Sequence, residues 1–199
     1  MQERHAIRAH ILNLIVAASM LLGSQAYGQS SIPDISFSVT RDGEFIQTDA
    51  RVDLPVARDV AWAVLTDYER YPSFISSMNE SKVVSRGPDG LVVEQKGRFS
   101  ILFFSQKVEA MMLVSEHPPN VIESRSIGGD FRAITGRYEL LQVGDRVRLS
   151  YLGRLAPNFS LPPVFGTSFV RYVLQRNFRE MVDEILRRNA TARQVLQSG

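Results

Sequence analysis

Apolar and polar residues alternate along most of the chain after residue 43, with the period of two that is typical of β-strands with one buried face. The first such segment covers residues 45–54, and Pro55 ends it. Further alternating segments follow, separated by turn-forming runs such as residues 87–90 and 117–120. Short turns between strands that each have a wet and a dry face predict an antiparallel meander.

Three segments have helical spacing of their apolar residues instead. Residues 57–65 carry one apolar stripe, and a proline marks the start of a second short helix over residues 72–76. Thr167 or Ser168 can cap a long third helix, because a long apolar stripe begins directly after them. We expect this stripe to pack on the dry face of the sheet. The tail over residues 189–199 is polar, and we expect it to fray.

The first 28 residues have the features of a secretory signal peptide. A basic start precedes an apolar run over residues 11–23, and Ala26 and Gly28 supply small residues at minus three and minus one. An uncleaved membrane anchor is the alternative, but a spanning helix needs about 20 apolar residues. The apolar run over residues 11–23 is shorter than that. We expect cleavage after Gly28 and, in a bacterium, export to the periplasm. The rest of the chain then divides into a lead-in segment (29–42), one domain (43–188) and the polar tail (189–199).

Composition narrows the chemistry that this domain can perform. The 199 residues include no cysteine, which excludes disulfides, thiolate metal sites and a cysteine nucleophile. Only His117 lies outside the leader, so a site with several histidines is excluded. The leader carries two bases and one acid, so without it the formal net charge of +2 becomes +1, and no basic cluster indicates nucleic acid. No P-loop, dinucleotide fingerprint or metal-ligand spacing occurs, so we expect neither a cofactor nor a metal.

Three short motifs carry a resemblance to a known family. Residues 67–74 (DYERYPSF) resemble a Tyr-Pro-x-Phe corner before the second strand, residues 118–122 (PPNVI) resemble a Pro-Pro-x-x-Ile hairpin, and Gly136-x-Tyr138 stands where Gly-x-Trp is common. Together they resemble motifs of the START-like (SRPBCC) superfamily, in its coenzyme-Q-binding and polyketide cyclase/dehydrase-like branch. The resemblance covers about residues 43–188. It implies an α+β helix-grip fold: a curved antiparallel sheet of about seven strands around a long C-terminal helix, with two short helices after the first strand.

The same resemblance implies an elongated apolar cavity between the sheet and the long helix, and a hydrophobic ligand such as a polyprenyl quinone or another lipid. Tyr138 and Tyr151 are the best candidates for polar contacts, because a buried phenol needs a hydrogen-bonding partner. The alternative is that the side chains fill the interior completely. The residues that we expect near the cavity are Tyr71, Phe74, Phe99, Met112, Ile134, Tyr138, Leu149, Tyr151, Phe169 and Val173.

Four consecutive large apolar residues fall near a predicted tip between two strands. Because such a cluster is costly to leave in water, we predict an apolar lip at the cavity mouth that touches a membrane or admits a lipid. The alternative is that the strands run longer and these residues belong to the core. The lip residues are Ile101, Leu102, Phe103 and Phe104, with Leu161, Val164 and Phe165 expected opposite.

Three classes of function remain open at this point. The first is a noncatalytic periplasmic carrier or chaperone for a hydrophobic small molecule, which the scarcity of titratable groups on the dry faces favours. The second is an aromatase- or cyclase-type enzyme, for which Glu123 and Arg125 could move protons, although a solvated strand is the simpler interpretation. The third is a protein-interaction module that uses the arginine-rich outer face of the last helix.

Overall fold

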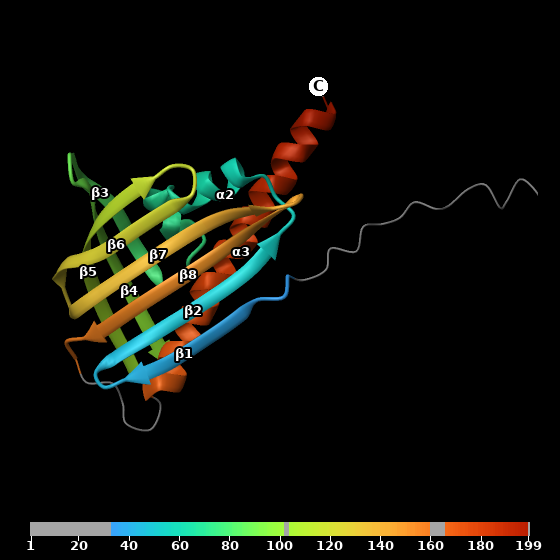
Figure 1. The fold of residues 1–199 in the computed structure, drawn as a ribbon. Helices are drawn as coiled ribbons and strands as arrows, with labels where there is room; N and C mark the ends of the chain where they lie inside the picture. Colours follow the sequence, from blue (N-terminus) through green and yellow to red (C-terminus); the bar gives the residue numbers. More distant parts are fainter. Residues whose placement is uncertain (1–32, 102–103, 160–165, 199) are drawn as a thin grey trace, which may run out of the picture. The chain divides into compact units, whose positions relative to one another are not determined.

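A computed structural model describes residues 33–101, 104–159 and 166–198, and the chain from Pro33 onward forms one compact unit. Eight strands form one antiparallel sheet in the order β1-β2-β8-β7-β6-β5-β4-β3 (Figure 1). The strands β1 and β3 lie at its two edges, so the sheet is curved but not closed. The elements are β1 (Ser36–Asp42), β2 (Phe45–Leu54), α2 (Arg58–Leu65), the 3-10 helix η1 (Tyr68–Ser73), β3 (Met78–Gly87), β4 (Gly90–Ile101), β5 (Phe104–His117), β6 (Val121–Gly129), β7 (Phe131–Val143), β8 (Arg146–Pro157) and α3 (Gly166–Ser198).

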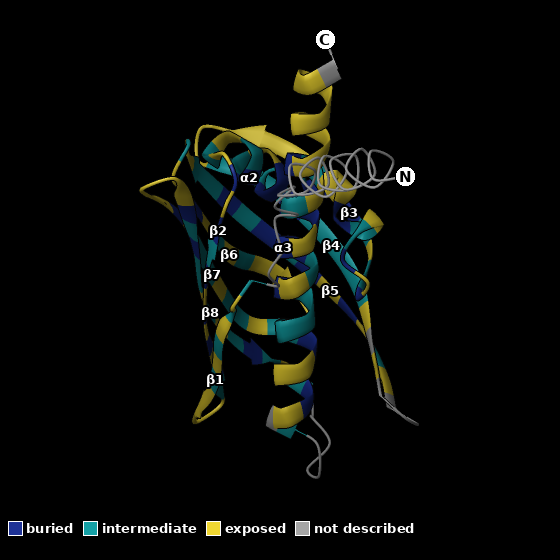
Figure 2. Cartoon of the chain, turned by 90° about the vertical axis from the view of Figure 1, so that its right-hand side faces the viewer, coloured by how far each residue is buried: buried dark blue, intermediate teal, exposed yellow. Residues whose placement is uncertain are grey.

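The long helix α3 occupies the open side of the sheet. Figure 2 shows it between β1 and β8 on one side and β4 and β5 on the other, with its buried residues turned toward the strands. Phe178, Val182 and Ile185 of α3 belong to the core cluster, and the ring of Phe178 lies 6.3 Å from that of Phe37 on β1. The predicted helix-grip fold is therefore confirmed, with one strand more than expected.

The alternation predicted for the strands is also confirmed. On β5, Val108, Ala110, Met112 and Val114 are buried, whereas Lys107 is exposed. Two-residue turns join several strands, and Gly144 supplies the positive φ of 61° that the β7–β8 turn requires. β5 thus presents one apolar face to the interior.

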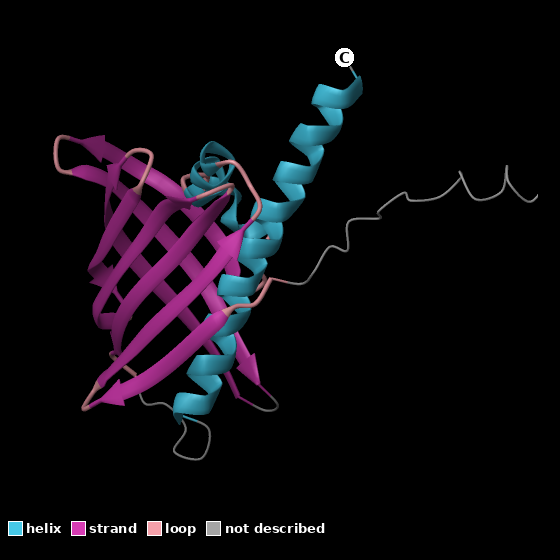
Figure 3. Cartoon of the chain, turned by 45° about the vertical axis from the view of Figure 1, so that its right-hand side comes forward, coloured by secondary structure: helices cyan, strands magenta, loops and turns pink. Residues whose placement is uncertain are grey.

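The expected lead-in over residues 29–42 is wrong for its last part, because Ser36–Asp42 forms β1 and pairs with β2 along its whole length. Ile35, Phe37 and Val39 do alternate with polar residues, but this run is short, and at the edge of the sheet none of the three is fully buried. The expected fraying of residues 189–199 is also wrong within the part described. Figure 3 shows α3 continuing past the end of the sheet, to Ser198. No Gly or Pro interrupts this segment, and the Arg193 side chain donates a hydrogen bond to the Pro55 carbonyl.

Two other boundaries differ from the predictions. The second short helix covers Tyr68–Ser73 rather than residues 72–76, with Pro72 inside it. A 3-10 helix of six residues makes few backbone hydrogen bonds, so proline is tolerated there. The long helix begins at Gly166, so Thr167 and Ser168 lie within its first turn and do not precede it. Sequence signals for helix ends are commonly shifted by such amounts.

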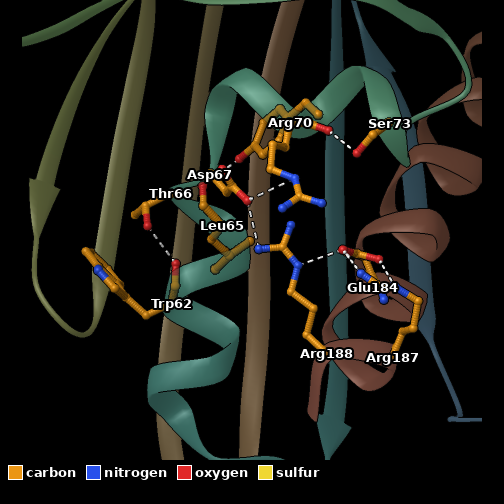
Figure 4. Close-up of polar contacts among 10 residues, drawn as sticks. Trp62, Leu65, Thr66, Asp67, Arg70, Ser73, Glu184, Arg187 and Arg188 are labelled. Carbon is orange, nitrogen blue, oxygen red and sulfur yellow. Dashed lines mark hydrogen bonds and ion pairs between the residues drawn. The ribbon is translucent and has the colours of Figure 1, made fainter. Parts of the chain in front are cut away.

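Arg188, which the buried carboxylate of Glu184 holds in place, joins α3 to the corner between α2 and η1. Glu184, only 7% exposed, accepts hydrogen bonds from Nε and Nη2 of Arg187 at 2.6 and 2.7 Å and from Nε of Arg188 at 2.6 Å (Figure 4). Arg188 also reaches Asp67, with 2.8 Å between Nη1 and Oδ2. The hydrogen bonds from Arg187 and then Arg188 lower the pKa of Glu184 to about 2. Arg188 therefore links α3 to Asp67, whereas Arg187, with 60% of its side chain exposed, pairs with Glu184 within the same helix.

The paired state of Glu184 should make the stability of the fold depend on pH. Its folded-state pKa of about 2 lies below the ordinary 4.5, so its contribution is complete above pH 4.5 and disappears as the pH falls toward 2. We expect Glu184→Gln to lower the free energy of unfolding at pH 7 by up to about 3 kcal/mol. Urea unfolding of both proteins at several pH values measures this difference.

The matched control is Asp183→Asn, which removes an exposed carboxylate from the neighbouring position. We expect it to change stability little at any pH. A difference between wild type and Glu184→Gln that stays constant from pH 7 to pH 2 would show that the charge on Glu184 is not the cause.

Candidate functional site

The inward face of the sheet changes from large to small side chains across its middle. Thr48, Gly153, Gly136 and Ser124 lie side by side as direct cross-strand partners on β2, β8, β7 and β6. Beyond them toward α2, the large side chains of Leu140 and Leu149 pack into the core. Small side chains leave room on this part of the inward face, and the Tyr151 ring occupies the room beside the two glycines.

A cavity of about 240 Å³ lies between the sheet, η1 and the middle of α3, and Ser124 is the member of this row that lines it. Its wall is mostly apolar, and none of the side chains that line it carries a charge at neutral pH. The lining residues are Leu65, Tyr68, Tyr71, Ile75, Met78, Gln95, Ala110, Met112, Val114, Ile122, Ser124, Ile134, Tyr138, Tyr151, Leu174, Asn177, Phe178 and Met181. A charged ligand group would find no counter-ion in this wall.

Two tyrosines on neighbouring strands form one end of the cavity wall. Tyr138 and Tyr151 are cross-strand partners, with their ring centroids 4.6 Å apart and an angle of 36° between the rings. Burial raises the pKa of Tyr151 to about 12 and that of Tyr138 well above 10, so both phenols keep their protons at neutral pH. Neither hydroxyl has a hydrogen-bonding partner among the described residues, which leaves two donors available to a ligand.

The other two tyrosines of the wall are already bonded. The Tyr71 hydroxyl donates to the Leu65 carbonyl at 2.6 Å, and the Tyr68 hydroxyl donates to Oε1 of Glu116 at 2.8 Å. These bonds anchor η1 to α2 and β5. Tyr68 and Tyr71 therefore shape the cavity, whereas Tyr138 and Tyr151 can interact with its content.

A second polar position lies across the cavity, on β3 and β4. Gln95 lines the cavity and is the cross-strand partner of Ser81, whose buried Oγ has no hydrogen-bonding partner. The Gln95 amide likewise has no partner within the described part of the chain. A few unpaired polar groups in an apolar wall are typical of sites that orient a small ligand.

The structure brings together half of the residues expected near the cavity. Tyr71, Met112, Ile134, Tyr138 and Tyr151 line it. Leu149 does not, because it packs in the dry core beside the cavity, and Phe74 lies behind the ring of Tyr71. Phe169 and Val173 are buried nearer the start of α3, and the side chain of Phe99 lies outside the described residues. Gln95 was identifiable as a polar residue on an otherwise apolar strand face.

The apolar lip is only partly covered by the described residues. The backbones of Ile101 and Phe104 are the last cross-strand pair of β4 and β5, so the segment lies at the end of this hairpin. Leu102 and Phe103, the side chains of Ile101 and Phe104, and the opposite residues Leu161, Val164 and Phe165 lie outside the described residues. The lip therefore stays a prediction.

The candidates for acid–base chemistry lie on the other side of the sheet. Glu123 and Arg125 are exposed, and they alternate with the inward-facing Ile122 and Ser124. Glu123 pairs with Arg137 at 2.5 Å. The described residues contain no group of three His, Asp or Glu side chains that could hold a metal ion.

A broader depression of about 990 Å³ crosses the outer face of the sheet, where Glu123, Arg125 and Arg154 line it. It is open to solvent and bordered by charged side chains. An apolar molecule would stay largely in water there. The inner cavity is therefore the better candidate for a hydrophobic ligand.

Comparisons with known proteins agree with this geometry. Residues 54–182 match the family described as "Polyketide cyclase / dehydrase and lipid transport". A search of curated proteins finds no match.

Within the described residues, no helix combines the length and hydropathy needed to cross a membrane.

Solved structures with the same fold share little sequence with this chain. A START superfamily protein from Mycobacterium smegmatis is 15% identical, with a TM-score of 0.58 and coverage of 73% of this chain and 98% of that one. The Zhui aromatase/cyclase from Streptomyces sp. R1128 is 14% identical, with a TM-score of 0.58 and coverage of 73% and 94%. Human StAR-related lipid transfer protein 5 is 13% identical, with a TM-score of 0.60 and coverage of 90% and 97%. The fold and the matched residues together place this chain in the polyketide cyclase/dehydrase and lipid transport family, within the START-like superfamily.

Proposed function

We propose that this protein binds an uncharged hydrophobic small molecule in the inner cavity and carries it, without chemical change, in the periplasm. A lipid or the ring of a polyprenyl quinone would suit the site. The export signal expected in residues 1–28 supports the location. The family description and the relatives named as lipid transfer proteins support the class of ligand.

The observation that carries this proposal is the character of the cavity wall. It is mostly apolar and contains no charged side chain. Its polar groups without a hydrogen-bonding partner among the described residues are the phenols of Tyr138 and Tyr151, the amide of Gln95 and Nδ2 of Asn177. Phenols that keep their protons donate hydrogen bonds to carbonyl, ether or hydroxyl oxygens. The wall therefore favours a neutral molecule that carries one or more oxygen atoms.

The volume limits how much of a ligand can enter. At about 240 Å³, the cavity is smaller than the 300 to 1,000 Å³ that is usual for drug-sized ligands. A ring or a short chain fits this space, whereas a whole polyprenyl chain does not. For a quinone, the head group would be the part inside.

The alternative function is an aromatase- or cyclase-type enzyme, to which the similarity with the Zhui aromatase/cyclase points. In that case Tyr138 or Tyr151 would have to move a proton. Their raised pKa values make both phenols poor acids at neutral pH. The carrier is therefore the better supported function.

A cavity-filling variant tests the binding site. Ala110 is 8% exposed and lines the cavity, so Ala110→Leu adds three carbon atoms to its interior. We expect the affinity for methyl decanoate to fall at least about tenfold, because the new side chain occupies the volume of several buried methylene groups. The melting temperature should change little, since the side chain enters empty space. Titration calorimetry measures the affinity.

The control variant is Ala63→Leu, the same change at an exposed position of α2. It should bind methyl decanoate as the wild type does. The control ligand is decanoate, whose carboxylate we expect to weaken binding to the wild type at least about tenfold at pH 7. Equal binding of the ester and the carboxylate, or no effect of Ala110→Leu, would contradict the proposed site.

The carrier proposal also includes transient contact with a membrane through residues 101–104. We expect the double variant Leu102→Ser and Phe103→Ser to lose binding to phospholipid vesicles, because both apolar side chains are removed from the hairpin end. Vesicle flotation measures this binding, and a melting curve reports on folding. If the double variant does not fold, these residues belong to the core and the proposed membrane contact is contradicted. Vesicle binding that the folded variant retains would also contradict the membrane contact.

A further inference from the structure

Two glycines face each other in the middle of the sheet. Gly136 on β7 and Gly153 on β8 are direct cross-strand partners on the inward face. Glycine inside a strand weakens it, and it commonly marks a place where another group approaches the backbone closely. Both have ordinary backbone conformations, since neither is among the glycines with positive φ. Their role here is to leave space.

The group that uses this space is the side chain of Tyr151. A Cβ atom placed on Gly153 would lie 2.5 Å from the Tyr151 hydroxyl oxygen and 2.8 Å from Cζ of the same ring. A Cβ atom on Gly136 would lie 3.4 Å from the Tyr151 hydroxyl and 3.0 Å from Oγ of Ser124. The phenol of Tyr151 therefore lies flat across both glycines, at the wall of the cavity.

The neighbouring positions show what the ring covers. Thr48 is the other cross-strand partner of Gly153, and Ser124 is the other partner of Gly136, so the whole row has small side chains. Without the Tyr151 ring, the cavity would extend over this row. The ring packs against Tyr138, and its hydroxyl forms no hydrogen bond with the described residues.

We propose that Tyr151 is the residue that sets the length of the ligand, because its ring occupies the part of the chamber that Gly136 and Gly153 leave open. This inference rests on the proposed function. A ligand extends until it meets the phenol, and the hydroxyl at that point donates a hydrogen bond to an oxygen at the ligand's end. Removal of the Tyr151 ring lengthens the cavity, and displacement of the ring into the cavity shortens it.

A series of straight-chain primary alcohols tests this inference, because the probes are neutral and differ only in length. Each methylene group that enters the cavity should raise the affinity about fourfold, up to the longest chain that fits. In Tyr151→Ala, this rise should continue to longer alcohols than in the wild type. In Gly153→Ala, the new methyl group pushes the far end of the Tyr151 side chain into the cavity, so the rise should end at shorter alcohols. Titration calorimetry gives the affinities.

The control is Tyr151→Phe, which keeps the ring and loses the hydroxyl. It should keep the wild-type length limit and weaken all alcohols by a similar factor. Opposite shifts in Tyr151→Ala and Gly153→Ala, with none in Tyr151→Phe, support the inference. If the wild type and the three variants all reach their highest affinity at the same alcohol length, the inference is overturned and the proposed function stays intact. A shift in Tyr151→Phe equal to that in Tyr151→Ala also overturns it.

Two further outcomes distinguish a failure of this inference from a failure of the proposed binding function. If the wild type binds no alcohol of any length, the proposed function fails and the inference with it. If Tyr151→Ala does not fold, Tyr151→Leu takes its place, since a leucine still fills part of the space while leaving the glycines partly uncovered. An unchanged limit in a folded Tyr151→Leu, together with an unchanged limit in Gly153→Ala, overturns the inference.

Discussion

The docking of α3 on the open side of the sheet is the interaction on which the rest of this structure depends. Because β1 and β3 do not meet, the sheet cannot close on itself, and its apolar face would be left in water without a cover. Val182 and Ile185 of α3 have no exposed surface and pack with the core of the sheet. The ion pair of Arg188 with Asp67 then joins this helix to the corner between α2 and η1, and Glu184 orients Arg188 from within the helix.

The same helix faces two different surfaces along its length. Ile185 is fully buried and belongs to the same core cluster as the large, fully buried side chains of Leu54 and Leu149. One to three turns earlier, the α3 residues that line the cavity opposite the sheet are Leu174, Asn177, Phe178 and Met181. One rigid helix cannot approach both surfaces equally closely, so tight packing at one end holds the cavity open at the other.

The chemistry of the cavity follows from which groups are paired. Tyr68 and Tyr71 use their hydroxyls to hold η1 in place, whereas Tyr138 and Tyr151 have donors left over. Charged residues of the same strands, such as Glu123 and Arg137, lie on the outer face and pair with each other there. Strand alternation thus separates a charged exterior from a neutral interior, and this separation favours binding of an uncharged molecule over proton transfer.

The sequence by itself determined the strand alternation on β5, the apolar stripe of α3 and, through the motifs around Tyr71 and Pro118, the fold, because these signals are local and periodic. It did not reveal β1, because that strand depends on pairing with β2. It also did not reveal the end of α3, because the polar segment over residues 189–198 contains no Gly or Pro and continues the helix. Only the tertiary structure decided which apolar residues face empty space. Leu149 and Tyr151 occupy equivalent inward positions on β8, but Leu149 meets neighbours that fill the core, whereas Tyr151 lies beside two glycines. Packing against partners far away in the chain makes that difference, and no local pattern encodes it.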